Sequence, residues 1–289
     1  MDLNNKLGLF LGLAIGDALG APLEFQKARE PENYLTKYTT GGPHNVAVGE
    51  WTDDTSMALA LATSLVEQKE FDADDVMNKF CQWFQHGEFC TREKCFDIGN
   101  TVYDALTSYM DSIKFNQHRQ PYRGRVAEET SGNGALMRMA PVIIVARDRD
   151  EAVRLAIQQT LLTHASQLCV KYSVMFAEEL YTGSPISKYS SYKLPSDIDR
   201  GEVMSGGFVK ETYEAAWWAF SSSNTFEECV IKAVNRGHDA DTTGAVAGML
   251  AGRYYGLSGI PDHFKDKLML FDDLYKTALD LANIKLTAF

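Results

Sequence analysis

Two acidic clusters, far apart in the sequence, combine carboxylates with hydroxyls. The first is Thr52-Asp53-Asp54-Thr55, and the second is Asp239-Ala240-Asp241-Thr242. Neighbouring carboxylates repel each other and are costly to dehydrate, so a buried cluster needs something to neutralise it. If the fold joins the two clusters, their oxygen atoms form a site that suits Mg²⁺, Mn²⁺ or Ca²⁺ better than zinc or copper.

Helix capping is the competing explanation for either cluster alone, because acidic residues are common in the first turn of a helix. Asp72-Ala73-Asp74-Asp75 has this position, and we interpret it as a solvated cap. The two threonine-containing clusters differ, since each is followed by an apolar run that should be buried. Buried carboxylates require partners, which favours a binding role for these two clusters.

The elements that must position the clusters are predicted to be helices, because apolar residues recur with the helical period. The predicted helices span residues 4–19, 54–68, 73–84, 151–163, 210–221, 225–235, 242–255 and 272–284. Residues 141–145 fit either a short strand or the start of a buried helix. Long loops are predicted at residues 21–51, 115–131 and 183–207. No linker interrupts the pattern, so we predict an all-α, compact single-domain multi-helix bundle over residues 1–289, with a central metal site.

Glycine recurs every four residues in two of the predicted helices. The two sets are Gly8, Gly12, Gly16 and Gly20, and Gly244, Gly248, Gly252 and Gly256. Each glycine inside a helix costs about 0.5–1 kcal/mol relative to alanine. A stripe of them therefore indicates close backbone packing against neighbouring helices, one option being each other, which would bring the acidic ends together. Charged residues in both segments argue against a G-x-x-x-G dimer face in a membrane.

The composition excludes several classes of protein. The chain has 289 residues, of which 45% are hydrophobic, enough for a packed core without disulfides. The net charge of −11 argues against a nucleic-acid partner, because binding to phosphate backbones needs a basic surface. The apolar run at residues 7–15 lacks a basic flank and is too short to cross a bilayer, so we predict neither export nor a membrane anchor.

Five cysteines, an odd number without disulfide-type spacing, predict reduced thiols and a cytoplasmic protein. A zinc site formed by Cys81, His86, Cys90 and Cys95 is an alternative. That alternative is weak, because the paired C-x2-C spacing of structural zinc sites is absent.

Between the two clusters lie several motifs that are unspecific singly. Taken alone, Glu24 is typical of a surface charge and His164 is typical of a core histidine. The turn at residues 131–134 could bind an anion through its backbone N–H groups, with Arg138 as a nearby cation. Their order, from about residue 7 to 261, resembles that of the ADP-ribosylglycohydrolase family. The matching motifs are Gly16-Asp17-Ala18-Leu19-Gly20 with Glu24, Thr52-Asp53-Asp54-Thr55, Phe96-Asp97-Ile98-Gly99, Ser131-Gly132-Asn133-Gly134 with Met137-Arg138-Met139-Ala140-Pro141, Thr163-His164, Gly206-Gly207-Phe208-Val209 and Asp239-Ala240-Asp241-Thr242-Thr243-Gly244.

The resemblance implies two divalent cations, Mg²⁺ or Mn²⁺, at the centre of a helical domain, with Glu24 joining their ligands or lying beside them. The implied metal ligands are Thr52, Asp53, Asp54, Asp239, Asp241 and Thr242. The implied contacts to ADP-ribose are Asn133, Gly134, Met137, Arg138, His164, Gly206, Gly207 and Phe208. The implied catalytic residues are Glu24, Asp54, Asp97 and Asp239, of which Asp97 would lie near the scissile bond. His238 stands where the family often has a small residue, and we expect it either to fill space at the rim of the metal site or to alter the substrate entrance.

The resemblance also implies a function: a metal-dependent hydrolase that removes ADP-ribose from a modified protein side chain, foremost arginine. One alternative keeps the chemistry but takes an O-linked or small-molecule ADP-ribose. Another is a non-catalytic member that binds ADP-ribose or has a structural role. All six implied metal ligands are present, which favours an enzyme. The oligomeric state does not follow from these residues.

Overall fold

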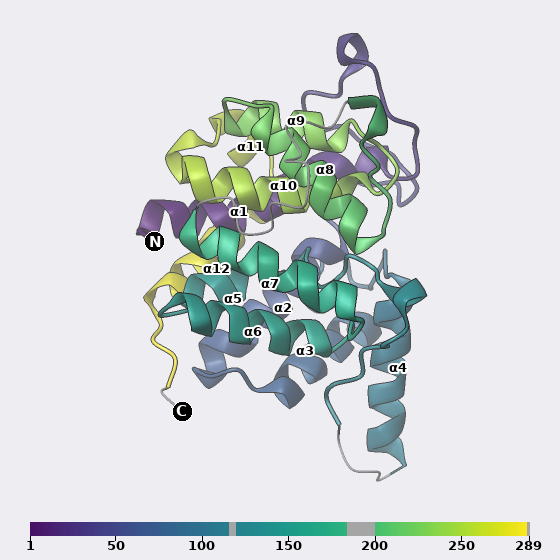
Figure 1. Cartoon of the computed structure of the whole chain (residues 1–289), viewed down its shortest axis with the longest axis vertical. Helices are drawn as coiled ribbons and strands as arrows, with labels where there is room; N and C mark the ends of the chain where they lie inside the picture. The colour runs from purple at the N-terminus through teal and green to yellow at the C-terminus, as the bar shows by residue number, and fades with distance from the viewer. Residues whose placement is uncertain (116–119, 184–199, 288–289) are drawn as a thin grey trace.

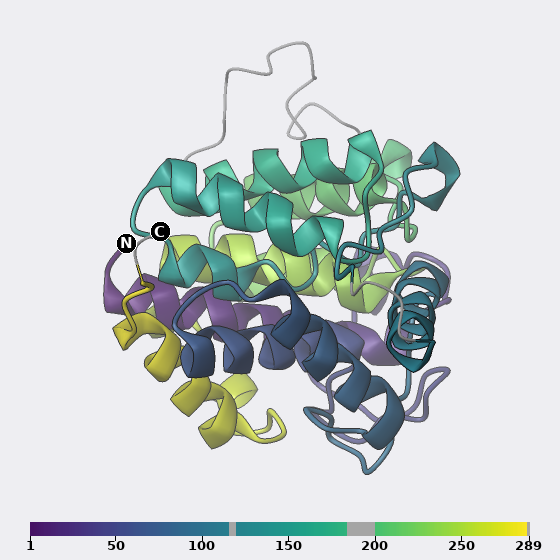
Figure 2. The same cartoon turned by 90° about the horizontal axis from the view of Figure 1, so that it is seen from below.

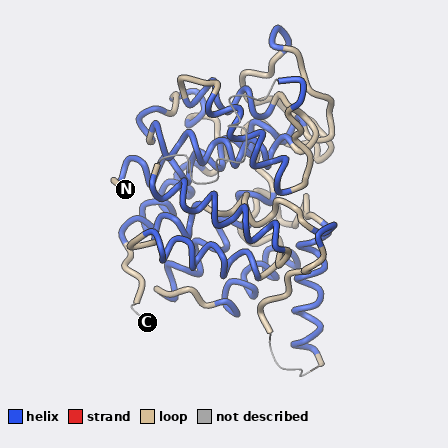
Figure 3. The backbone as a smooth tube through the Cα atoms, in the orientation of Figure 1, coloured by secondary structure: helices blue, strands red, loops and turns tan. Residues whose placement is uncertain are grey.

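The structure, a computed structural model, describes residues 1–115, 120–183 and 200–287. Within these residues the regular elements are helices, and backbone bridges between extended residues occur only singly. Figure 3 shows this as helices joined by loops. The predicted all-α class is therefore confirmed. The predicted loop at 183–207 falls largely on residues 184–199, which lie outside the described residues, as do residues 116–119 of the loop at 115–131.

All eight predicted helices are present, with ends within two residues of the prediction. Residues 141–145 belong to a buried helix, not a strand, and the prediction missed α4, α7 and the short α11. The helices are α1 (Leu3–Gly20), α2 (Asp53–Gln68), α3 (Ala73–His86), α4 (Asn100–Lys114), α5 (Ala140–Val145), α6 (Arg149–Leu161), α7 (Gln167–Thr182), α8 (Val209–Ser221), α9 (Phe226–Val234), α10 (Ala240–Tyr255), α11 (Asp262–Lys265) and α12 (Phe271–Asn283).

Helices α1 and α10, from opposite ends of the chain, lie side by side in the middle of the bundle (Figures 1 and 2). They run antiparallel, and their glycine stripes face each other. A Cβ atom added to α1 would overlap the backbone of α10 at four successive turns, in the pairs Gly8–Gly252, Gly12–Gly248, Gly16–Gly244 and Gly20–Ala240. The predicted close approach is confirmed, and the partner of each stripe is the other. The C-terminal end of α1 thus meets the N-terminal end of α10.

The remaining helices surround this pair. Helices α2 and α12 pack on α1, and α8 and α9 pack on α10, while α6 and α7 pack against each other and contact α5. With the following turn, α1 is the one described helix that is long and apolar enough to cross a membrane, over Leu3–Leu23. That stretch is almost entirely buried by the other helices, and its apolar character is accounted for by its place in the core.

We predict that Gly12→Ala destabilises the protein, although alanine is the better helix former. The added methyl group would overlap the carbonyl oxygen of Gly248, and backbone of α10 cannot move aside without disturbing its neighbours. The expected loss in the free energy of unfolding is at least about 2–3 kcal/mol, measured by denaturant titration. Gly99→Ala is the control, because its Cβ would meet no atom within 4 Å. Equal stability of the two variants would contradict the packing argument.

Candidate metal centre and substrate pocket

The two acidic clusters meet where α1, α2 and α10 converge. Asp54 of α2 and Asp241 of α10 are joined there by Asp17 of α1, and one oxygen from each lies within 4.8 Å of the others. All three side chains are buried. The antiparallel contact of α1 with α10 brings Asp17 and Asp241 together, and the start of α2 completes the group. The sequence-based expectation that the clusters adjoin is thus correct.

Asp17 fixes the position of the first turn of α2. Its carboxylate accepts hydrogen bonds from the backbone N–H of Thr52 (2.9 Å) and of Thr55 (3.0 Å). It also accepts from the hydroxyls of the same two threonines, at 2.9 and 2.6 Å. Four donors occupy this carboxylate, so its function is to hold Thr52 and the following aspartates in place. Asp17 belongs to the motif at residues 16–20, but its role in holding α2 was not predicted.

Helix capping does not account for either cluster. Thr52 and Asp239 precede α2 and α10 as N-cap residues, yet neither side chain makes a capping hydrogen bond. By contrast, Asp72 accepts a hydrogen bond from the backbone N–H of Asp75 at the start of α3, as a cap should. The capping interpretation therefore holds for Asp72 and fails for the two clusters.

Burial makes the ionised cluster costly. It raises the pKa of Asp54 and of Asp241 well above the usual range, and nearby carboxylates add to this effect. Burial also raises the pKa of Asp17, to about 7, although its hydrogen bonds from the two threonines oppose the change. One oxygen of Asp54 has no hydrogen-bond partner. A divalent cation would satisfy that oxygen and neutralise the charges, and this all-oxygen donor set fits such an ion.

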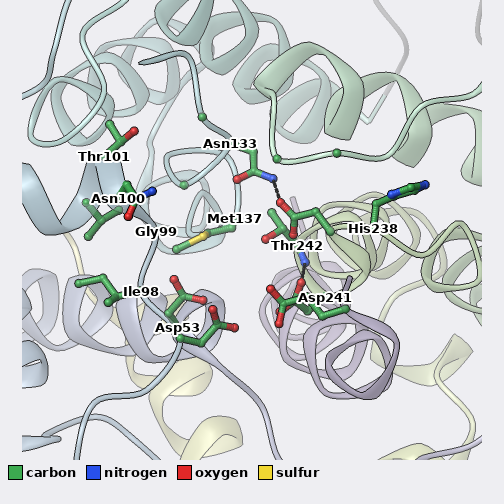
Figure 4. A pocket seen from close by; sticks show the side chains of 18 of the residues that line it. Asp53, Ile98, Gly99, Asn100, Thr101, Asn133, Met137, His238, Asp241 and Thr242 are labelled. Atoms are coloured by element: carbon green, nitrogen blue, oxygen red, sulfur yellow. Dashed lines mark hydrogen bonds between the residues drawn. The ribbon is translucent and has the colours of Figure 1, made fainter. Parts of the chain in front are cut away.

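A cavity of about 710 Å³ lies beside this cluster (Figure 4). Asp53, Asp241 and Thr242 face the cavity, whereas Thr52 and Asp54 are not among the residues that line it. Asp53 is 8% exposed, and burial together with the carboxylate of Asp97 raises its pKa well above the usual range. The cavity therefore gives a ligand access to the acidic cluster.

One part of the cavity is lined by glycines and an amide. The loops at residues 131–134 and 206–209 are joined by two hydrogen bonds, from Asn133 N to Gly207 O (3.1 Å) and from Val209 N to Ser131 O (2.9 Å). The Asn133 amide donates to Asp239 Oδ2 at 2.7 Å, which Figure 4 shows as a dashed line. This bond connects the glycine-lined part of the cavity to the second acidic cluster.

His164 also lines this part of the cavity and packs against its glycines. A Cβ on Gly134 would approach the imidazole to 2.9 Å, so only glycine fits there without displacing the ring. Burial, with a contribution from the Arg138 charge, lowers the pKa of His164 to about 3. The ring is therefore neutral at physiological pH, and its Nδ1 lies 2.8 Å from the hydroxyl of Thr163.

The structure contradicts one expected contact. Arg138 does not reach the cavity: it is fully buried, and its guanidinium donates to Gln159 Oε1 (3.0 Å) and Thr163 Oγ1 (2.7 Å). The guanidinium also stacks 4.7 Å from the ring centre of Phe80. Arg138 therefore holds the loop before α5 in place and supplies no cation to a ligand. Gly134, Met137, Gly206 and Gly207 line the cavity as expected, while Phe208 adjoins it through its backbone bridge to Gly132.

Glu24 and Asp97 form an acidic part of the cavity, and a histidine that the sequence analysis missed lies between them. His44 Nε2 is 3.0 Å from Glu24 Oε2 and 3.3 Å from Asp97 Oδ1. Burial and the charge of Asp97 raise the pKa of Glu24 to about 8, while the hydrogen bond with Asp97 raises that of His44. The loop position of His44 was the only available signal, because its sequence spacing to Glu24 fits no motif.

The loop that carries His44 is firmly held. Arg92 Nη1 donates to the carbonyl oxygen of His44 (3.1 Å), and the same guanidinium pairs with Glu50 at 2.8 Å. The zinc alternative finds no support, because Cys90 and Cys95 are not among the side-chain groups in the described part of the chain that could hold a metal. Moreover, the side-chain groups in the described part of the chain that could hold a metal do not include Cys81 or His86.

The sequence and the fold of this chain are similar to those of known proteins. A family model described as ADP-ribosylglycohydrolase matches residues 2–287. The chain is 36% identical to the ADP-ribosylarginine hydrolase Tri1 of Pseudomonas putida, with 96% of this chain and 78% of the relative covered. It is 31% identical to the ADP-ribosyl-[dinitrogen reductase] glycohydrolase of Rhodospirillum rubrum, with 92% and 90% covered. A solved structure titled ADP-ribosylglycohydrolase-related protein complex superposes with a TM-score of 0.80, at 33% identity and 98% coverage of both chains.

We predict that the metal-free protein, kept in chelator, loses stability as the pH rises from about 4 to about 7. Asp17 binds a proton more tightly in the folded state, where its pKa is about 7, than in the unfolded state, near 3.8. The folded state therefore holds more protons in this window, and stability falls as they leave. Millimolar Mg²⁺ or Mn²⁺ should restore the midpoint of thermal unfolding at pH 8.

Asp54→Asn is the matched control for this experiment. Removing one buried charge should make the metal-free variant more stable than the metal-free unmodified protein at pH 8. It should also reduce the rise in the unfolding midpoint that the cation causes. Unfolding midpoints that do not change with pH or with cation would contradict the buried-cluster argument.

Proposed function

This chain belongs to the ADP-ribosylglycohydrolase family and is a hydrolase, and we propose that it releases ADP-ribose from ADP-ribosylated arginine side chains of proteins. Two relatives named ADP-ribosylarginine hydrolase, at 36% and 34% identity over most of the chain, support arginine as the linkage. The observation that carries the proposal is the cavity itself, in which an acidic cluster adjoins both a glycine-lined part and the Glu24–His44–Asp97 group.

We assign the binding of two divalent cations, Mg²⁺ or Mn²⁺, to the residues of the two acidic clusters. The buried carboxylates and the unpartnered oxygen of Asp54 support this assignment. Such cations supply orientation of the ribose and electrostatic stabilisation of its reacting centre. The assigned ligands are Thr52, Asp53, Asp54, Asp239, Asp241 and Thr242.

The glycine-lined part of the cavity is assigned to ADP-ribose. The absence of side chains at Gly134 and Gly207 lets their backbone N–H groups approach an anionic diphosphate, while Gly132 and Gly206, whose N–H groups bind Thr130 O and Glu211, leave room for it. The neutral ring of His164 adds no charge there. The loop anchored by Asn133 fixes this part of the site relative to the acidic cluster.

The acidic part is assigned to proton transfer. Water attacks the anomeric carbon while the bond to the arginine nitrogen breaks, with oxocarbenium character at the sugar. Glu24 in its ionised form accepts the proton of the attacking water, and its raised pKa of about 8 lets the carboxyl hold that proton and pass it to the departing arginine nitrogen. His44 lies between Glu24 and Asp97 and holds both carboxylates in position. We also propose a cytoplasmic location, which the five free cysteines support.

The test is incubation with arginine-ADP-ribosylated and serine-ADP-ribosylated proteins, with Mg²⁺, Mn²⁺ or chelator, and measurement of released ADP-ribose. We expect release from arginine alone, and loss of activity in chelator. Asp241→Ala should lower kcat by at least about 100-fold without unfolding the protein, because it removes a charge from the metal site. Asp72→Ala, at the solvated cap of α3, should keep full activity. Release from neither substrate with any cation would overturn the proposal.

A further inference from the structure

Two residues at the rim of the cavity, Phe25 and His238, have backbone conformations that are unusual for their type. Both have positive φ angles, +59° for Phe25 and +55° for His238. A bulky residue in this left-handed region carries strain of about 1–3 kcal/mol, and such strain is concentrated at functional sites. Both residues line the cavity, and Figure 4 shows His238 at its edge.

The two strained residues hold each other in place. Phe25 N donates to His238 O at 2.6 Å, and His238 N donates to Gln26 O at 2.7 Å. Gly237 lies so close to this loop that a Cβ there would overlap Gln26 O. The hydrogen bond from Arg29 N to Asn235 O (2.9 Å) continues the connection. The rim is therefore a rigid pair of loops rather than two separate turns.

Each loop places a carboxylate toward the cavity and a ring beside it. Glu24 is 6% exposed, but its neighbour Phe25 is 74% exposed. In the other loop, exposed His238 precedes Asp239, whose carboxylate binds Asn133. A largely exposed phenylalanine gains little from folding and still adopts a strained conformation. The hydrogen bonds between the loops hold this backbone conformation, and they leave the Phe25 ring exposed at the cavity, where it is available to a ligand.

The residues at this rim indicate the chemical class of the ligand group that binds there. Both residues line the cavity together with the carboxylates of Glu24, Asp97 and Asp239, so this part of the cavity attracts a cation. Aromatic faces bind guanidinium groups and also cover aliphatic stems. An arginine side chain supplies both, whereas a serine supplies neither.

We propose that Phe25 and His238 form the subsite for the leaving arginine and thereby determine specificity for arginine-linked ADP-ribose. This inference rests on the proposed hydrolase function. The Phe25 ring lies against the guanidinium and stem of the substrate arginine, and His238 covers the other side. Neither residue takes part in bond cleavage, and neither contacts the ADP-ribose that remains after arginine has left.

The test compares Phe25→Ala with the unmodified protein on an ADP-ribosylated arginine peptide. We expect KM to rise about 3- to 30-fold, as the loss of a cation–π contact predicts, with little change in kcat. Inhibition by free ADP-ribose should stay the same, because this product lacks the guanidinium. Phe25→Tyr, which keeps the ring, should retain the original KM. His238→Ala should raise KM in the same direction.

Two further variants separate substrate contact from a structural role. Phe25→Gly should have an equal or higher unfolding temperature, because glycine adopts positive φ without strain, yet it should show the same rise in KM. Phe115 is another exposed aromatic residue, 64% exposed at the far end of α4 and about 20 Å along that helix from the cavity. Phe115→Ala should therefore change neither the unfolding temperature nor KM.

Each outcome has a distinct meaning. An unchanged KM in Phe25→Ala, with normal hydrolysis by the unmodified protein, would overturn the subsite alone. Equally weakened inhibition by ADP-ribose would also overturn it, by showing that the ring binds the nucleotide. No hydrolysis of the arginine peptide by the unmodified protein would overturn the proposed function and this subsite together.

Discussion

The contact between α1 and α10 is the interaction on which the rest of the structure depends. Glycine at successive turns removes the side chains that normally separate two helices, so the backbones touch directly. Because the contact is antiparallel, the end of α1 and the start of α10 meet at one point. Asp17 and Asp241 are buried there together, and Asp17 in turn holds the first turn of α2 through Thr52 and Thr55. The acidic site is a consequence of this packing.

The same packing explains why the site needs a cation. A carboxylate near the surface can be hydrated, but Asp54 and Asp241 are buried, Asp241 at the wall of the cavity and Asp54 behind it. The helices cannot separate to admit much water without breaking the glycine contact. The packing that buries the carboxylates is therefore also what makes them need a cation. A ligand reaches the acidic cluster through the cavity.

Much of this arrangement could be predicted from the sequence, since helical periodicity and the glycine spacing are local patterns. Helices α4 and α7 were missed because their β-branched, aromatic and polar residues lower helix propensity, although buried Val102, Leu106 and Tyr109 have helical spacing. His44 was not predictable, because its contacts with Glu24 depend on how a long loop folds back. Arg138 follows the expected motif, but its backbone turns the guanidinium toward Gln159 and the core. Side-chain direction at a turn is a tertiary property that spacing does not encode.

Joining the two ends of the chain also has a kinetic consequence. The contact between α1 and α10 has a very high contact order, so the loop-closure entropy of almost the whole polypeptide must be overcome before the two glycine stripes can meet. During synthesis, α1 leaves the ribosome long before its partner exists, and its apolar surface must wait exposed. Asp54 and Asp241 likewise remain apart until this last docking step, so a half-made chain has no assembled site with which to capture an ion or cleave a substrate.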